Sequence, residues 1–179
     1  MQVLKWILFG TVSRAVLTVL AAQFGAFGGH APGHMGPRDG RLKPPSKTPN
    51  SVSSQADAWV EHPMQDYARI APLALRGDGP ATMARVKRIV EAMPGAQVIE
   101  SRPDYLYVQF STRLMKFVDD AEFWFDPASG VVQVRSASRV GTIGALHWRV
   151  ASARCIGALP REVSQPASNC DAFLPRNGA

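Results

Sequence analysis

Two groups of residues in the second half of the chain have side chains that could do chemistry. Asp119 and Asp120 are adjacent, and the run Arg135-Ser136-Ala137-Ser138-Arg139 follows them after a turn-like segment. Paired carboxylates can bind a divalent cation, a serine hydroxyl can act as a nucleophile, and arginines bind anions. One hypothesis is a hydrolase-like enzyme that uses Asp119, Asp120 or Ser138 as catalytic groups. In this enzyme, Arg135 or Arg139 would bind an anionic substrate.

The spacing of these residues argues against a catalytic site or a metal site formed by them. A serine nucleophile needs a neighbouring base, and no histidine lies near Ser138 in the sequence. Adjacent residues on a strand point to opposite faces of a sheet, so Asp119 and Asp120 are poorly placed to share a metal ion. The 4 histidines and 2 cysteines show no ligand spacing, and His30 and His34 flank Pro32 in a glycine-rich segment. The sequence therefore predicts no metal site and no cofactor.

The same residues fit a β-hairpin whose register can be argued. A four-residue loop over 127–130, closed by Asp126 and Val131, would place Phe125 opposite Val132 and Phe123 opposite Val134. Both pairs are apolar, so this face belongs to a core. A slip of one residue would mix apolar and charged side chains on each face, which makes the register specific.

On the opposite face, this register predicts a cross-strand ladder of charges. Glu122 faces Arg135, and Asp120 lies diagonal to Arg135 and Arg139. If the ladder is exposed to solvent, loss of Glu122 should cost no more than about 1 kcal/mol. Asp119 and Ser138 fall on the core side, where they need hydrogen-bond partners.

Other segments supply the remaining elements of a sheet domain. Residues 77–95 predict a helix that Asp78 or Gly79 caps, with Pro80 in its first turn and Pro94-Gly95 at its end. Residues 96–101 and 104–110 alternate as strands, and residues 144–157 have helical character. The apolar stripe of the first helix should lie on the sheet; it consists of Met83, Val86, Ile89, Val90 and Met93.

We therefore expect an α+β domain, in which a four-stranded antiparallel sheet packs against helices in two layers. It is preceded by an N-terminal hydrophobic segment and an irregular lead-in. The expected organisation is a signal peptide or membrane anchor over 1–29, a Gly/Pro-rich linker and lead-in over 30–54, the α+β domain over 55–157 and an irregular tail over 158–179. Cys155 and Cys170 could be bridged in an oxidising compartment or remain two separate thiols.

The first 29 residues fit more than one kind of targeting or anchoring segment. Lys5 and Arg14 precede an uncharged run of residues 15–29, which is shorter than the about 20 residues that span a bilayer and is typical of a signal peptide. Ala26 and Gly28 then offer a cleavage site. A retained anchor from Leu4 to Phe27 is long enough but would bury Arg14, at a cost of about 2.5–3.5 kcal/mol.

All of these interpretations of the N-terminal segment favour a protein that is exported or located in an organelle. Besides a signal peptide and a retained anchor, the segment could be an organelle transit segment, because no acidic residue precedes Asp39. We expect a membrane-associated protein on the extracytoplasmic side, or in a mitochondrial or plastid compartment.

The distribution of charge disfavours nucleic-acid binding. The formal net charge is +6, but the excess of Lys and Arg lies in the first 50 residues, and the remaining body is nearly neutral. Phosphate-backbone binding needs basic side chains gathered on one folded face. We therefore expect a membrane, and not a nucleic acid, as the partner.

Five sequence segments occur in an order that resembles the domain-of-unknown-function family numbered 1499. They are "GRLKPPSKTPNSVSSQ", "IAPL", "MPGA", "FVDDAEF" and "VRSASRVG", and the resemblance covers about residues 36–155. It implies a small exported or membrane-attached domain without an established activity. The resemblance marks a functional or structural centre at Pro49, Asn50, Val52, Ser53, Ser54, Gln55, Asp119, Asp120, Glu122, Arg135, Ser136, Ser138 and Arg139.

The chain also departs from the pattern that it resembles. Two cysteines of the family's lead-in are replaced here by Pro45 and Ser51, and an Asp and an Asn expected beyond Gly141 are lacking. The resemblance therefore implies no thiol chemistry in the lead-in, and it weakens any activity that used those polar groups.

Three classes of function remain open from the sequence. The first is a noncatalytic accessory or binding domain at a membrane, which could be one of the subunits of a larger membrane complex. The second is the hydrolase-like enzyme described above. The third is a carrier of an apolar ligand between helix and sheet. In the first class, the candidate binding residues are Arg135, Arg139, Glu122, Asn50, Ser53, Ser54 and Gln55.

Overall fold

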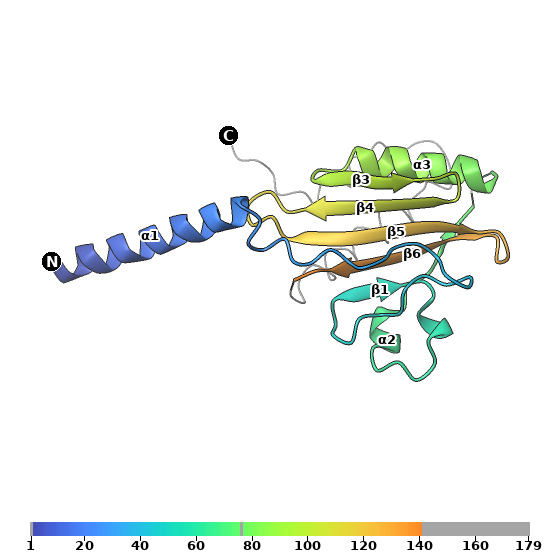
Figure 1. Ribbon diagram of the computed structural model, residues 1–179, viewed down its shortest axis with the longest axis horizontal. Helices are drawn as coiled ribbons and strands as arrows, with labels where there is room; N and C mark the ends of the chain where they lie inside the picture. Colours follow the sequence, from blue (N-terminus) through green and yellow to red (C-terminus); the bar gives the residue numbers. More distant parts are fainter. Residues whose placement is uncertain (1, 76, 141–179) are drawn as a thin grey trace, which may run out of the picture.

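The central hairpin of the fold has the register that the sequence predicts. The computed structural model describes residues 2–75 and 77–140, and its longest strands are β5 (Val118–Asp126) and β6 (Val131–Ser138) (Figure 1). Phe125 pairs with Val132, Phe123 with Val134, and Glu122 with Arg135. The apolar pairs thus share one face, and the charged pairs share the other.

The hairpin lies inside a larger antiparallel sheet. β4 (Tyr105–Ser111) pairs with β5, and β3 (Ala96–Ser101) pairs with β4 at one edge. At the other edge, β1 (Ser51–Ser53) and β2 (Leu73–Ala74) pair with β6 one after the other along its length. Within the described residues the sheet therefore has six strands, in the order β1-β6-β5-β4-β3 with β2 also on β6.

The prediction of four strands was wrong in its count. β1 has 3 residues and β2 has 2, which is too short for the apolar alternation that reveals a strand. Both form because the open edge of β6 offers unpaired backbone groups, which is a tertiary effect. The α+β class and the antiparallel pairing are confirmed.

One face of the sheet packs against α3 (Gly79–Glu91) as expected. The Asp78 side chain accepts a hydrogen bond from the Ala81 amide at 2.7 Å, and Pro80 lies in the first turn. A core forms between the helix and the sheet, and its fully or nearly buried members include Met83, Val86, Val90, Leu106, Val108, Phe123, Val132 and Val134.

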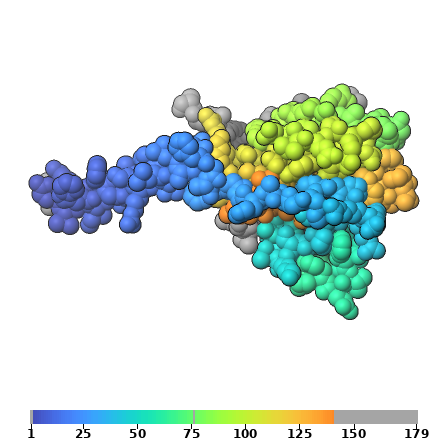
Figure 2. All heavy atoms as spheres, in the orientation of Figure 1, coloured from blue at the N-terminus to red at the C-terminus, as the bar shows by residue number. Residues whose placement is uncertain are grey.

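The opposite face of the sheet is covered by residues 29–46, which we call the strap. Gly29 lies against Arg139, the Gly36 amide bonds to Glu122, and the Pro44 carbonyl accepts from Arg135. The strap therefore runs along the sheet, turns, and comes back toward β1. It crosses the front of the molecule as a blue band in the space-filling view (Figure 2).

A tight turn reverses the strap. The backbones of Arg38 and Arg41 exchange two hydrogen bonds of 2.8 and 3.0 Å, and Asp39 and Gly40 between them have φ angles of 51° and 70°. Two central residues with positive φ are typical of a type I′ hairpin turn, in which Asp-Gly is a favoured pair. The segment predicted as an irregular lead-in thus has a defined path.

Other described elements lie at the periphery. α1 (Gln2–Gln23) projects away from the sheet domain, and η1 (Ala56–Ala58) and α2 (Gln65–Ala68) flank β1 (Figure 1). The helix predicted at 144–157, Cys155, Cys170 and the tail lie outside the described residues.

Substitution at Gly95 should destabilise the fold more than substitution at Gly130. Both glycines have positive φ, which costs a non-glycine residue about 1–2 kcal/mol. A Cβ at Gly95 would also lie 2.2 Å from the Ser111 carbonyl oxygen, whereas none of the described atoms lies within 4 Å of a Cβ at Gly130. Gly95→Ala should therefore lose about 1–3 kcal/mol more than Gly130→Ala, measured by denaturant unfolding of the full chain. Equal losses would show that β4 yields at this contact.

Candidate functional site

The predicted charge ladder exists, but it is buried and internally paired. Asp120 and Arg139 form a two-bond ion pair, with Nη2–Oδ1 at 2.7 Å and Nε–Oδ2 at 2.8 Å. Their side chains are 4% and 10% exposed, and the Tyr107 hydroxyl donates to the same carboxylate. The sequence left open whether the ladder is exposed, and the structure shows it buried, because the strap covers this face.

Glu122 and Arg135 make the second pair, which joins the sheet to the strap. Glu122 Oε1 accepts from the Gly36 amide at 2.7 Å and from the Tyr105 hydroxyl at 2.9 Å. Glu122 Oε2 lies 3.7 Å from Arg135 Nη1, and Arg135 Nη2 donates to the Pro44 carbonyl at 3.3 Å. Glu122 is fully buried, so its carboxylate interacts with groups in the protein interior.

The tyrosines of this face are held in their protonated form. Burial, followed by the charge of Glu122, raises the pKa of Tyr105. Burial and the hydrogen bond to Asp120 raise the pKa of Tyr107. Desolvation lowers the pKa of Arg135, and the nearby carboxylates of Glu122 and Asp120 oppose this change. The phenols therefore serve as hydrogen-bond donors to buried carboxylates.

The candidate catalytic residues Asp119, Asp120 and Ser138 are divided between the two faces of the sheet. Asp119 pairs in register with Ser138, whereas Asp120 pairs with Ala137 and points to the other face. The Ser138 hydroxyl donates to the Val140 carbonyl at 3.1 Å, and no histidine of the described segments is hydrogen-bonded to it. In residues 2–75 and 77–140, no group of three or more His, Cys, Asp or Glu side chains is placed to hold a metal ion.

The polar residues around β1 hold neighbouring segments together. Asn50 Nδ2 donates to the Ser138 carbonyl at 3.0 Å, and the Ser54 hydroxyl accepts from the Val134 amide at 2.8 Å. Ser53 pairs with Arg135 in the sheet. These residues lie at the edge of the sheet next to Arg135 of the charged cluster.

Gln55 links this edge to the strap. Its Oε1 accepts from the Leu42 amide at 2.8 Å, and its Nε2 donates to the Gly40 carbonyl at 3.0 Å. The side-chain amide thus holds one backbone group within the strap turn and one just after it. The candidate binding residues of this segment therefore act in the structure as internal connections.

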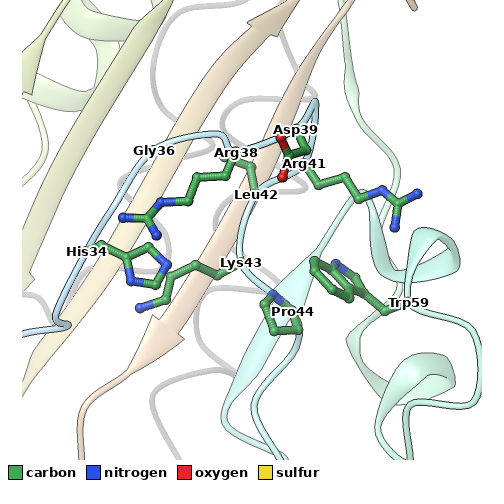
Figure 3. A pocket seen from close by; sticks show the side chains of 9 residues that line it. All are labelled: His34, Gly36, Arg38, Asp39, Arg41, Leu42, Lys43, Pro44 and Trp59. Atoms are coloured by element: carbon green, nitrogen blue, oxygen red, sulfur yellow. The ribbon is translucent and has the colours of Figure 1, made fainter.

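An open groove lies over the strap, and this groove was not predicted from the sequence. The groove has a volume of about 410 Å³. Several of its side chains are basic, and one is acidic (Figure 3). We call it the basic groove, and it is lined by His34, Gly36, Arg38, Asp39, Arg41, Leu42, Lys43, Pro44 and Trp59.

The strap turn places the basic side chains of this groove. Figure 3 shows His34, Arg38 and Lys43 gathered on one side, while Arg41 extends toward Trp59 (Figure 3). The Arg41 guanidinium carbon lies 5.8 Å from the centre of the Trp59 ring, and Nη1 donates to the Ala58 carbonyl at 3.3 Å. The Asp39-Gly40 pair between two arginines is the sequence signal that could have revealed this arrangement.

The groove has an excess of positive charge that its lining does not neutralise. Partial desolvation, followed by Arg38 and Lys43, lowers the pKa of His34. Desolvation, followed by the charge of Arg135, lowers the pKa of Lys43. Desolvation is the larger cause of both shifts, and the neighbouring cations act in the same direction.

The architecture defines the molecule as a small α+β sheet domain with an N-terminal apolar helix. Within that class, the chain belongs to the family described as "Protein of unknown function (DUF1499)", whose sequence profile matches residues 41–145. The comparison with curated proteins and the comparison with solved structures found no match. The family match spans the six strands, the buried charges and the returning half of the strap, and it brings no activity with it.

Removing the buried carboxylate should cost more than removing an exposed one. Glu122→Ala leaves the Arg135 guanidinium buried without its carboxylate partner, which typically costs about 3–5 kcal/mol. The matched control is Glu100→Ala, because the Glu100–Arg102 pair is 43% and 49% exposed and should contribute no more than about 1 kcal/mol.

Denaturant unfolding of the two full-length variants measures this difference. A Glu122→Ala loss as small as that of Glu100→Ala would mean that water reaches the cluster beneath the strap.

Proposed function

We propose that this chain is a noncatalytic binding domain held at a membrane by its N-terminal helix. The observation that carries the proposal is α1, a helix of 22 residues that is long and apolar enough to cross a bilayer. None of its apolar window is buried against the domain, and Trp6 and Leu4 are 71% and 70% exposed. Exposed apolar surface of this extent is favourable in lipid and unfavourable in water.

The length of α1 supports a retained anchor as well as a cleaved signal. At 1.5 Å per residue, 22 helical residues extend about 33 Å, compared with a hydrocarbon core of about 30 Å. Arg14 lies near the middle of the helix and opposes insertion by about 2.5–3.5 kcal/mol. The apolar side chains of Val3, Ile7, Phe9, Val12, Val16, Leu17 and Leu20 favour insertion.

The pairing of the buried charges favours a noncatalytic role over a hydrolase. Asp120 has both oxygens engaged by Arg139, and Glu122 holds the strap through Gly36. A general base or metal ligand needs a lone pair that substrate can reach, and these carboxylates are 4% and 0% exposed. Their geometry supports a structural role for the candidate catalytic aspartate.

An apolar-ligand carrier is the less supported alternative. The hollow between α3 and the β3–β4 side of the sheet has a volume of about 310 Å³. It is open to solvent, and Lys87, Arg102 and Ser101 contribute to its lining. An apolar ligand would instead require an enclosed apolar cavity.

The proposed location is the extracytoplasmic side of a membrane or an organelle compartment. In that position the sheet domain would be available to other subunits of a membrane complex. The basic excess near the start of the chain and the apolar α1 support association with a membrane.

Carbonate extraction and intact mass test the anchor together. Native membranes containing the full chain are washed at alkaline pH, and the protein retained in the pellet is purified in detergent and weighed. We expect retention in the pellet with the mass of the uncleaved chain, because α1 would span the hydrocarbon core. Release into the wash with a mass that lacks about the first 29 residues would contradict membrane attachment.

A further inference from the structure

We propose that the basic groove is a binding site for a phosphate group, carried either by a soluble phosphate ester or by a lipid headgroup. The proposal rests on the proposed binding function and names the ligand class of that domain. It starts from the contrast between the two sets of charges on the strap face. The buried set is balanced and paired, whereas the groove set is cationic and open.

The buried pairs leave the groove cations with one carboxylate in their own lining, that of Asp39. Asp120 is engaged by Arg139, and Glu122 by Gly36, Tyr105 and Arg135. Among the described residues, the side chains of Arg38 and Lys43 form no ion pair, although both line the groove.

The geometry of the turn brings donors together from both legs of the strap. His34 and Arg38 lie before the Asp39-Gly40 reversal, and Lys43 lies after it (Figure 3). Two charged donors and an imidazole on one side of a groove suit an oxyanion that accepts several hydrogen bonds. Gln55 holds the backbone of the turn, so binding requires the donor side chains to reorient but leaves the path of the strap in place.

The rest of the groove suits the organic part of a phosphate ester. Trp59 and Pro44 form its opposite wall, and the volume of about 410 Å³ exceeds what a single phosphate group fills. Arg41 lies beside Trp59 and keeps the potential positive there. A phosphate on the His34 side with a small organic group against Trp59 uses the whole groove.

The cations that contribute to the pKa shifts of His34 and Lys43 would also attract an anion. The pKa values of His34 and Lys43 are lowered by desolvation and by neighbouring cations. A bound dianion would reverse the charge part of this effect and raise both pKa values. The groups that face these two residues are Arg38, Lys43, Glu122, Asp120 and Arg135.

The test is calorimetric titration of the full chain in a nonionic detergent with three probes: inorganic phosphate, phenyl phosphate and a short-chain phosphatidic acid. We expect saturable binding that Arg38→Gln or Lys43→Gln weakens about 10-fold or more, because each removes a charged hydrogen bond. The matched control is Arg85→Gln, which removes an exposed cation from α3 on the other face and should change the affinity less than 2-fold.

The arms of the experiment distinguish the sources of the phosphate. Tighter binding of phenyl phosphate supports a soluble ester, and tighter binding of the phosphatidic acid supports a lipid headgroup. No binding of any probe, or equal weakening by Arg38→Gln and Arg85→Gln, would overturn the proposal. Unchanged unfolding midpoints of the variants establish that a lost affinity is not lost folding.

Two further readouts separate this proposal from the proposed function. Release of phenol from phenyl phosphate would overturn the noncatalytic role and leave phosphate binding supported. Retention in carbonate-washed membranes without binding of any probe would overturn phosphate binding alone.

Discussion

The carboxylate of Glu122 is a fully buried ionisable group on the face of the sheet beneath the strap, and its position constrains much of what surrounds it. Placing such a group in a protein interior is costly unless charges and hydrogen-bond donors compensate it. The compensation comes from three parts of the chain: the Gly36 amide of the strap, the Tyr105 hydroxyl of β4 and the guanidinium of Arg135 on β6. Arg135 in turn needs the Pro44 carbonyl, so both legs of the strap are tied to one buried ion pair.

The charged side chains on the strap face of the sheet fall into two groups, one that holds the strap to the sheet and one that lines the groove. Asp120, Glu122, Arg135 and Arg139 satisfy one another beneath the strap, and they explain why sheet and strap stay together. The charged side chains that line the open groove are mainly cations, namely Arg38, Arg41 and Lys43 beside Asp39. A chain segment that covers the interior thus also forms the surface that we propose for binding.

The parts of the fold that could be predicted are those encoded by local pattern. The Phe123 and Phe125 alternation against two valines allows one register of the β5–β6 hairpin, and Asp78 with Pro80 marks the start of α3. Alternation also showed that Glu122 and Arg135 lie on the face away from α3. It could not show what covers that face, since the strap has no periodicity and reaches the sheet through backbone groups such as the Gly36 amide.

The same reasoning explains the elements that the sequence did not reveal. β1 and β2 depend on the open edge of β6, and edge pairing leaves no pattern in strands of 3 and 2 residues. The groove depends on a reversal at Asp39-Gly40 inside a Gly/Pro-rich stretch, where composition alone indicates a linker. The predicted site residues were therefore found as an internal cluster, whereas the exposed groove required the folded strap.

Amide hydrogen exchange at Gly36 tests most directly whether Glu122 fixes the strap. The account predicts that the Gly36 amide of the full chain is protected to a degree similar to amides of β5 and β6, because it is buried and donates to Glu122 at 2.7 Å. Exchange at Gly36 as fast as at the exposed Gly33 would contradict the account, since the strap would then leave the sheet without disturbing it.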